Sequence, residues 1–187
     1  NRFITANNFG DIVFNGDWYV YTFDSKFNLK DKRLINANSF CTMLDNKHLF
    51  ISRSDSRRIL LSPDYKEINI THEHLNKSVV DCINITPDII AMASISGLFI
   101  YDISKRKIIA YDTSKLSCLS VFQSNPYEFL VGYEDGIIRT YKIAEGVLSL
   151  SKELRINDGY GIAKMTLAEN DELYLSTFNG IGILNLL

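Results

Sequence analysis

Short apolar segments alternate with polar turns along the whole chain. The segments are rich in β-branched and aromatic residues, which favour strands. Several are continuous apolar runs, such as 89–93 and 129–131, and such runs are typical of sheets that are buried on both faces. No segment carries an apolar stripe of helical period, so the pattern predicts an all-β protein.

Turn dipeptides recur between these segments at a regular interval. Their second residues, which lie 39 to 44 positions apart, are Asp17, Ser56, Gly97, Gly136 and Gly180. A four-stranded propeller blade occupies about 40 to 45 residues. The interval therefore predicts a β-propeller of four-stranded antiparallel blades.

The window 118–155 shows the expected blade most clearly. Its four expected strands are 118–122, 129–133, 137–143 and 147–154. Asp135-Gly136, between the second and third runs, is a strong hairpin signal because both residues tolerate positive φ. Turn residues separate the other runs, so the window has room for four strands but not for a crossover helix.

The same interpretation divides a single domain, 1–187, into five blades. The blades are expected at approximately 2–36, 40–71, 79–113, 118–155 and 162–187. The last blade stops after three strands and lacks its outer strand, and the chain has no spare strand to supply it. We therefore expect an incomplete propeller, closed by further chain or by a strand from a partner.

The third window resembles a WD40 repeat. His72 or His74 lies in the loop before its first strand, where that family has Gly-His. Tyr101-Asp102 stands where the family has Trp-Asp at the end of the third strand. The fourth window adds its Asp-Gly turn at the family's position. The resemblance implies a noncatalytic propeller that serves as a scaffold subunit in a multiprotein complex.

In the resembling family, partners usually bind the rim formed by the turns between second and third strands and by the loops before first strands. We expect partner proteins or peptides to contact this rim. The candidate residues are Trp18, Arg57, Arg58, His72, Asp135 and Tyr160. The opposite rim, with Lys105 to Lys107 and Tyr127, is the alternative.

The charge balance and hydropathy narrow the choice of partner. Lys and Arg number 20 and Asp and Glu number 22, so the net charge is -2. A broad nucleic-acid footprint needs clustered positive charge, so nucleic acid is not the expected partner. No apolar run approaches the roughly 20 residues of a membrane-spanning helix, and no membrane span is expected.

The three cysteines, Cys41, Cys82 and Cys118, are too few and too scattered for a disulfide framework or a zinc site. Each lies in an apolar run, so we predict buried thiols in a reducing compartment. This places the protein inside the cell, in the cytoplasm or nucleus.

No constellation of residues points to catalysis. His72 and His74 bracket Glu73, but no nucleophile or third ligand accompanies them. We therefore predict no catalytic residue, no cofactor and no metal. Two alternatives remain: a propeller-based hydrolase that uses rim carboxylates or histidines, and a nucleic-acid-associated protein that uses basic loops such as Lys105 to Lys107.

Overall fold

The computed structural model describes residues 3–7, 9–16, 18–34, 38–53, 55, 57–64, 66–114, 116–126, 128–156, 159–168 and 172–185. All regular secondary structure in these residues is β-strand. The prediction of an all-β fold is confirmed.

The strands form five blades in chain order. Blade 1 contains β1 (Phe3–Ala6), β2 (Ile12–Asn15), β3 (Tyr19–Phe23) and β4 (Leu29–Leu34). Blade 2 contains β5 (Asn38–Met43), β6 (Leu49–Arg53), β7 (Arg58–Leu61) and β8 (Glu67–Asn69). Blade 3 contains β9 (Val79–Thr86), β10 (Ile89–Ser94), β11 (Gly97–Asp102) and β12 (Lys107–Asp112). Blade 4 contains β13 (Cys118–Asn125), β14 (Glu128–Tyr133), β15 (Ile137–Ala144) and β16 (Val147–Arg155). Blade 5 contains β17 (Ile162–Leu167), β18 (Glu172–Thr177) and β19 (Gly180–Asn185).

Each of the first four blades is a four-stranded antiparallel meander, and blade 5 has three strands in the described residues. Both features were predicted, and the hairpin predicted at Asp135-Gly136 is present between β14 and β15. Gly136 has φ of 76°, a conformation that favours glycine. A Cβ at this position would also lie 3.0 Å from the carbonyl oxygen of Tyr160.

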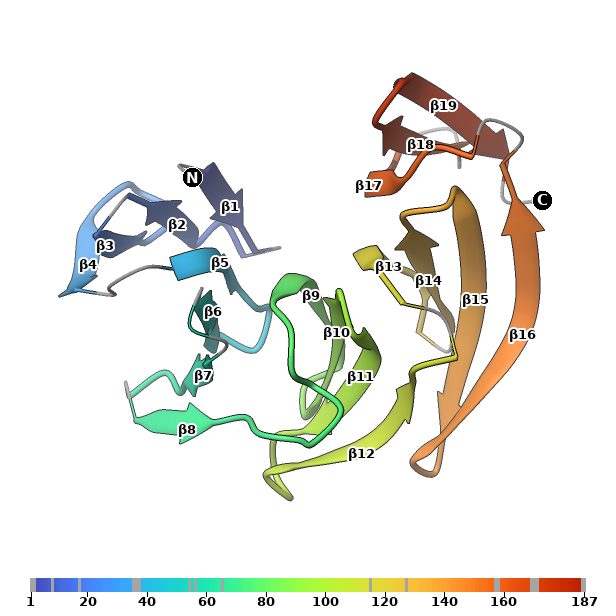
Figure 1. The fold of residues 1–187 in the computed structure, drawn as a ribbon. Helices are drawn as coiled ribbons and strands as arrows, with labels where there is room; N and C mark the ends of the chain where they lie inside the picture. The colour runs from blue at the N-terminus through green and yellow to red at the C-terminus, as the bar shows by residue number, and fades with distance from the viewer. Residues whose placement is uncertain are drawn as a thin grey trace.

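The five blades follow one another along an arc (Figure 1). The first strands of successive blades contact one another, β1 with β5, β5 with β9, β9 with β13, and β13 with β17. These strands lie at the centre, while the fourth strands lie at the periphery (Figure 1). Blades 1 and 5 stand on either side of an opening in the arc (Figure 1).

Four apolar clusters fill the interfaces between neighbouring blades. Blades 3 and 4 are covered on both faces, so β10 is buried from Ile90 to Ser94 and β11 is buried throughout. This explains why the apolar run 89–93 is continuous: a strand between two packed faces has no solvent side. The largest buried side chains include Tyr101, Tyr133, Tyr141, Phe50, Phe99 and Phe129.

Polar contacts between blades supplement this packing near the centre. The Val121 backbone N–H donates to Asp81 Oδ2 across 3.1 Å, which joins β13 to β9. Ser120 Oγ donates to the Ile162 carbonyl oxygen across 2.7 Å, which joins β13 to β17. Lys164 Nζ lies 3.0 Å from both carboxylate oxygens of Asp81, so this ion pair links β17 of blade 5 to β9 of blade 3.

The meander places the connections at two ends of the blades. We call the end with the turns between second and third strands, and with the loops between blades, the upper rim. The end with the remaining turns is the lower rim. In chain order the described connections of the upper rim are 16 and 18, 53–58 in part, 70–78, 95–96, 113–117 in part, 134–136, 156–161 in part and 178–179.

Candidate partner-binding rim

All six residues predicted as partner contacts lie on the upper rim, spread over its blades. Trp18 is in the turn between β2 and β3 and is 62% exposed. Tyr160 is in the loop between blades 4 and 5 and is 44% exposed. Large aromatic side chains in such positions provide contact area at small entropic cost, as in known protein interfaces.

The two neighbouring arginines differ in exposure. Arg57 is exposed, and its Nε lies 3.6 Å from Asp55 Oδ2. Arg58 is only 6% exposed, and its Nη2 donates to the carbonyl oxygen of Lys77 across 2.5 Å. Burial lowers the pKa of this guanidinium. Arg58 therefore ties the start of β7 to the loop between blades 2 and 3, beneath the surface, and a partner contact at this residue stays a prediction.

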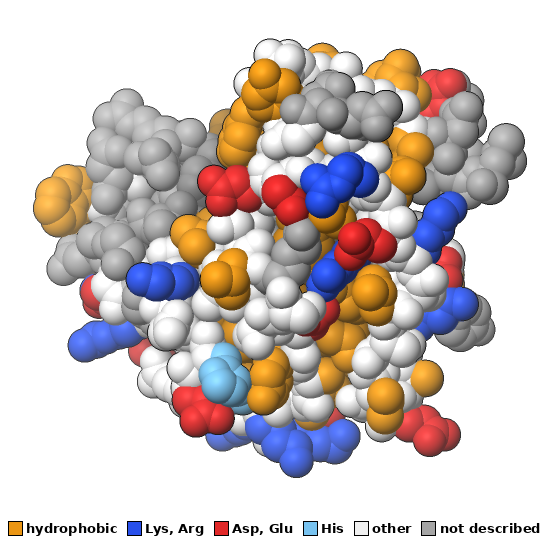
Figure 2. Space-filling model, turned by 45° about the vertical axis from the view of Figure 1, so that its right-hand side comes forward, with side chains coloured by type: hydrophobic (Ala, Val, Ile, Leu, Met, Phe, Trp, Pro, Cys, Tyr) orange, Lys and Arg blue, Asp and Glu red, His pale blue; other side chains and the backbone are white. Residues whose placement is uncertain are grey.

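His72 belongs to an aromatic cluster at the start of the loop that leads into blade 3. Its ring centroid lies 5.0 Å from that of Tyr111 and 5.9 Å from that of Phe99. The ring of His74 lies beside it at a tilt, with centroids 5.5 Å apart, and His74 Nε2 lies 3.5 Å from Glu73 Oε1. Figure 2 shows histidine beside hydrophobic and acidic side chains on this side of the molecule. The cluster packs the loop onto blade 3.

Asp135 is half-buried in its turn, and its Oδ1 accepts a hydrogen bond from the Ile137 N–H across 3.4 Å. It therefore supports the turn geometry as well as contributing negative charge to the upper rim. Tyr160 lies directly against this turn, because its backbone contacts Gly136. Asp135 and Tyr160 are thus brought together, whereas Trp18, Arg57 and His72 lie on other blades.

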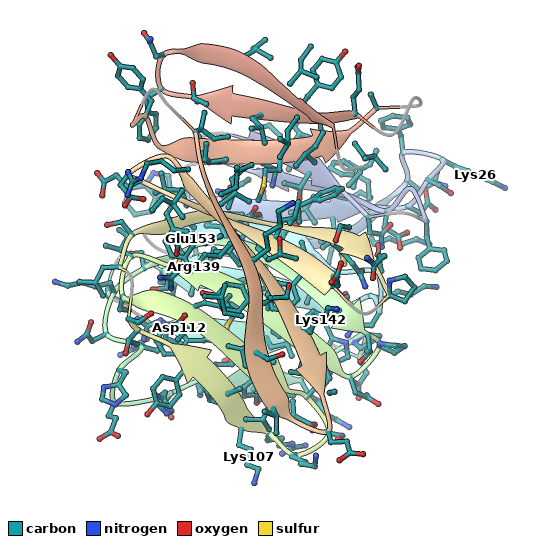
Figure 3. All side chains as sticks on the ribbon, turned by 90° about the vertical axis from the view of Figure 1, so that its right-hand side faces the viewer. Lys26, Lys107, Asp112, Arg139, Lys142 and Glu153 are labelled. Carbon is teal, nitrogen blue, oxygen red and sulfur yellow. The ribbon has the colours of Figure 1, made fainter. Side chains whose placement is uncertain are left out.

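A charged network lies between blades 3 and 4, close to the upper rim. Arg139 Nη1 donates to Asp112 Oδ2 across 3.0 Å, and Arg139 Nε donates to Glu153 Oε2 across 2.8 Å. Figure 3 shows Arg139 between these two carboxylates. The Tyr141 hydroxyl donates to Asp112 Oδ2 across 2.6 Å and lies 2.9 Å from the Tyr133 hydroxyl. The network therefore joins β12 to β14, β15 and β16.

The protonation state of Asp112 follows from these contacts. Burial alone would raise the pKa of Asp112, but hydrogen bonds from Ser114 and Tyr141 and the charge of Arg139 outweigh it, so the pKa is lowered. Burial raises the pKa of Tyr141, as does its hydrogen bond to Asp112. At neutral pH the carboxylate is therefore ionised and both tyrosine hydroxyls keep their protons. The arrangement suits a structural contact better than proton transfer.

The cysteines are free and buried, as expected from their apolar surroundings. Burial raises the pKa of Cys41 to about 12, and burial also raises that of Cys118 to about 12. Burial raises the pKa of Cys82 as well. A thiol must ionise to act as a nucleophile or metal ligand, so these environments disfavour both roles.

Other candidate chemistry is sparse in the part of the chain that the structure describes. No group of three or more His, Cys, Asp or Glu side chains there could hold a metal ion. The basic turn on the lower rim is partly neutralised, because Lys105 Nζ lies 2.9 Å from Asp102 Oδ2. Lys107 lies far from the Asp112 network (Figure 3), and Tyr127 is outside the described residues. Among the described residues there is no helix that could cross a membrane.

Sequence reasoning missed the Asp112 network and several exposed apolar residues of the upper rim. The sequence did contain a signal for Tyr141, because in the fourth window this residue stands where a WD40 repeat has its Trp. Asp112 and Arg139 had none, because they are 27 residues apart and meet only when two blades pack. The missed apolar residues, Ile95, Leu116 and Phe178, resemble core positions in sequence.

Comparison with solved structures gives the fold. No protein-family model matches the chain, and no curated protein matches it in sequence. A chain of the mitotic checkpoint complex superposes with a TM-score of 0.79 at 8% identity, covering 98% of this chain and 61% of that one. The β-propeller domain of Cps50 (Swd1) from Myceliophteria thermophila gives 0.77 at 12% identity, covering 98% and 71%. The WD40 repeats of RRP9 give 0.74 at 11% identity, covering 92% and 59%.

The chain therefore has the fold of a WD40-type β-propeller, as its repeats predicted. It spans about 60% to 70% of the length of these structures. The identities of 8% to 12% establish the fold and nothing finer.

Proposed function

We propose that the chain is a noncatalytic scaffold that binds other proteins or peptides through its upper rim, as a subunit of an intracellular multiprotein complex. The observation that carries this proposal is a difference between the packed blades, which form a rigid frame, and the loops of the upper rim. Between the blades, titratable groups such as Asp81, Asp112 and Arg139 are engaged in ion pairs. On the upper rim, Trp18 and Tyr160 are exposed on loops held by that frame.

One of the similar solved structures is a chain of the mitotic checkpoint complex, and this similarity supports a role in a protein assembly. The free, buried cysteines support a reducing compartment. A hydrolase is less favoured, because His72 packs against aromatic rings and the buried thiols resist ionisation. Nucleic-acid binding is less favoured because the net charge is -2.

The proposal is tested by affinity capture with the 187-residue chain as bait in extract from its own cells. Trp18→Ser combined with Arg57→Glu removes an exposed aromatic side chain and reverses an exposed charge on the upper rim. We expect this variant to lose specific partners at least tenfold without a change in thermal unfolding temperature. Lys107→Glu is the matched lower-rim control. Loss of partners with Lys107→Glu alone would place binding on the lower rim.

We further propose that additional β-structure, from a partner or from further chain, completes the arc. Blade 1 turns an apolar face away from blade 2, with Ile4, Phe14 and Tyr21 in one cross-strand row. Ile4 is 67% exposed. On blade 5, Ile181 and Ile183 are 79% and 58% exposed. Sheet faces of this kind gain stability when another sheet covers them.

A further inference from the structure

Large apolar side chains cluster on the upper rim of blades 3 to 5. Ile95 lies in the turn of blade 3, Phe178 in the turn of blade 5, and Leu116 and Tyr160 in the two loops between these blades. All four are 42% to 67% exposed. Together with the half-buried Leu119 at the start of β13, they form what we call the rim patch.

Two sets of contacts bring members of the rim patch near one another. A Cβ added to Gly161 would lie 2.7 Å from Phe178 Cε2 and 2.8 Å from Leu119 Cδ1, so these two side chains meet above this glycine. Tyr160 is the next residue along the chain. On the other side, the Ser117 N–H donates to the Ile95 carbonyl oxygen across 2.9 Å, which places Leu116 next to the turn of blade 3.

The position of Phe178 separates the rim patch from the open face of blade 5. Its ring leans toward Leu119 and Gly161, which belong to blade 4 and to the loop that follows it. The exposed Ile181 and Ile183 are instead on β19. A sheet that covered β19 would therefore leave this side of Phe178 in place on the upper rim.

The backbone of one acidic residue, Glu134, lies within the rim patch. The Glu134 N–H donates to the Ser117 carbonyl oxygen across 3.0 Å, and Glu134 Cα is 3.1 Å from the Cβ position of Gly161. The Glu134 side chain is exposed, and no ion pair is formed by it within the described residues. An apolar surface with a negative centre complements a ligand that is apolar and basic.

We propose that the rim patch binds a peptide segment in which a large apolar side chain lies next to Lys or Arg. The apolar side chain packs between Phe178, Leu119 and Leu116, and the basic side chain pairs with Glu134. The proposal rests on the proposed function, since it names the part of the upper rim that binds and the chemistry of the partner. An exposed apolar surface beside a fixed charge gives both affinity and selectivity for such a segment.

The test is selection of peptides from a random 12-residue display library on the immobilised 187-residue chain. Selected peptides are then synthesised with a fluorescent label, and their binding is measured by polarisation. We expect enrichment of Leu, Phe or Trp adjacent to Lys or Arg. Phe178→Ser and Glu134→Lys should each weaken binding of the selected peptides at least tenfold.

Matched controls distinguish the rim patch from other exposed apolar surfaces. Phe9→Ser removes an equally exposed ring on the lower rim, and Ile181→Ser changes the open face of blade 5. Both should bind as the unmodified chain does. A peptide with Glu in place of its basic residue should bind Glu134→Lys better than the unmodified chain.

Each contrary outcome has a definite meaning. If the selected peptides bind more weakly to Trp18→Ser or Arg57→Glu but equally well to Phe178→Ser, the proposal for the rim patch is wrong. The proposed function, binding through the upper rim, would still hold. Peptides sensitive only to Phe9→Ser would contradict both. The proposal for the rim patch is also wrong if the selected peptides are not enriched in apolar residues next to Lys or Arg. It is equally wrong if they bind the unmodified chain no better than they bind Phe178→Ser.

Discussion

At the scale of single residues, Asp112 shows how one carboxylate holds two blades together. It accepts hydrogen bonds from Arg139 and Tyr141 of blade 4 while belonging to β12 of blade 3. Its folded-state pKa is lower than the ordinary value of 3.8. The ionised form therefore stabilises the fold above about pH 4, and this stabilisation is lost as the pH falls through the folded-state pKa.

Asp112→Asn should lower the free energy of unfolding at pH 7 by about 2 kcal/mol, because Arg139 loses its charged partner across the interface of blades 3 and 4 and keeps only Glu153 of its own blade. Urea unfolding at pH 7 and at pH 3.5 measures this. The variant should lose less stability between the two values than the unmodified chain does. Asp55→Asn, which changes an exposed ion pair, should cost less than about 1 kcal/mol. Equal costs for both variants would contradict the assignment.

Gly132 makes a steric prediction at the same scale. A Cβ there would lie 2.5 Å from Ser120 Oγ and 2.6 Å from Ile162 Cβ, at the interface of blades 4 and 5. Gly132→Ala should therefore destabilise the chain by about 1 to 3 kcal/mol. Gly182→Ala meets ordinary contacts at 3.8 Å and should be much milder in the same thermal unfolding assay.

At the scale of elements, the sequence predicted strands well and their contacts poorly. The period, the Asp135-Gly136 turn and the continuous run 89–93 each reflect local backbone preference or burial, so they are readable along the chain. The exposure of a given rim residue depends on which blade packs beside it. Arg57 and Arg58 are adjacent in sequence, yet only the fold decides that one is exposed and the other buried.

The same packing predicts a gradient of stability among the strands. β10 and β11 lie between two covered faces, whereas β4 and β19 are at margins of their sheets. Amide hydrogen exchange should therefore be slowest in β10, β11 and β14 and fastest in β4 and β19. Mass spectrometry of peptides resolves these strands. Uniform protection across all five blades would show that the open faces are covered in solution.

At the scale of the whole molecule, the exposed faces of blades 1 and 5 govern behaviour in solution. Apolar sheet faces and unpaired edges promote association. The 187-residue chain on its own should form concentration-dependent oligomers in sedimentation velocity. Ile4→Ser together with Ile181→Ser should reduce this association, and Phe9→Ser should not. A cooperatively melting monomer at all concentrations would indicate a self-closed ring instead.

The ion pair between Asp81 and Lys164 has a mechanical consequence. It connects blade 3 directly to blade 5, the two blades that flank blade 4. We therefore expect it to limit movement of blade 4 relative to both neighbours. We therefore expect blades 3 to 5 to move together, and the rim patch lies entirely on these three blades. A ligand that docks there meets a surface whose spacing is already set, and it loses little binding free energy to ordering the protein.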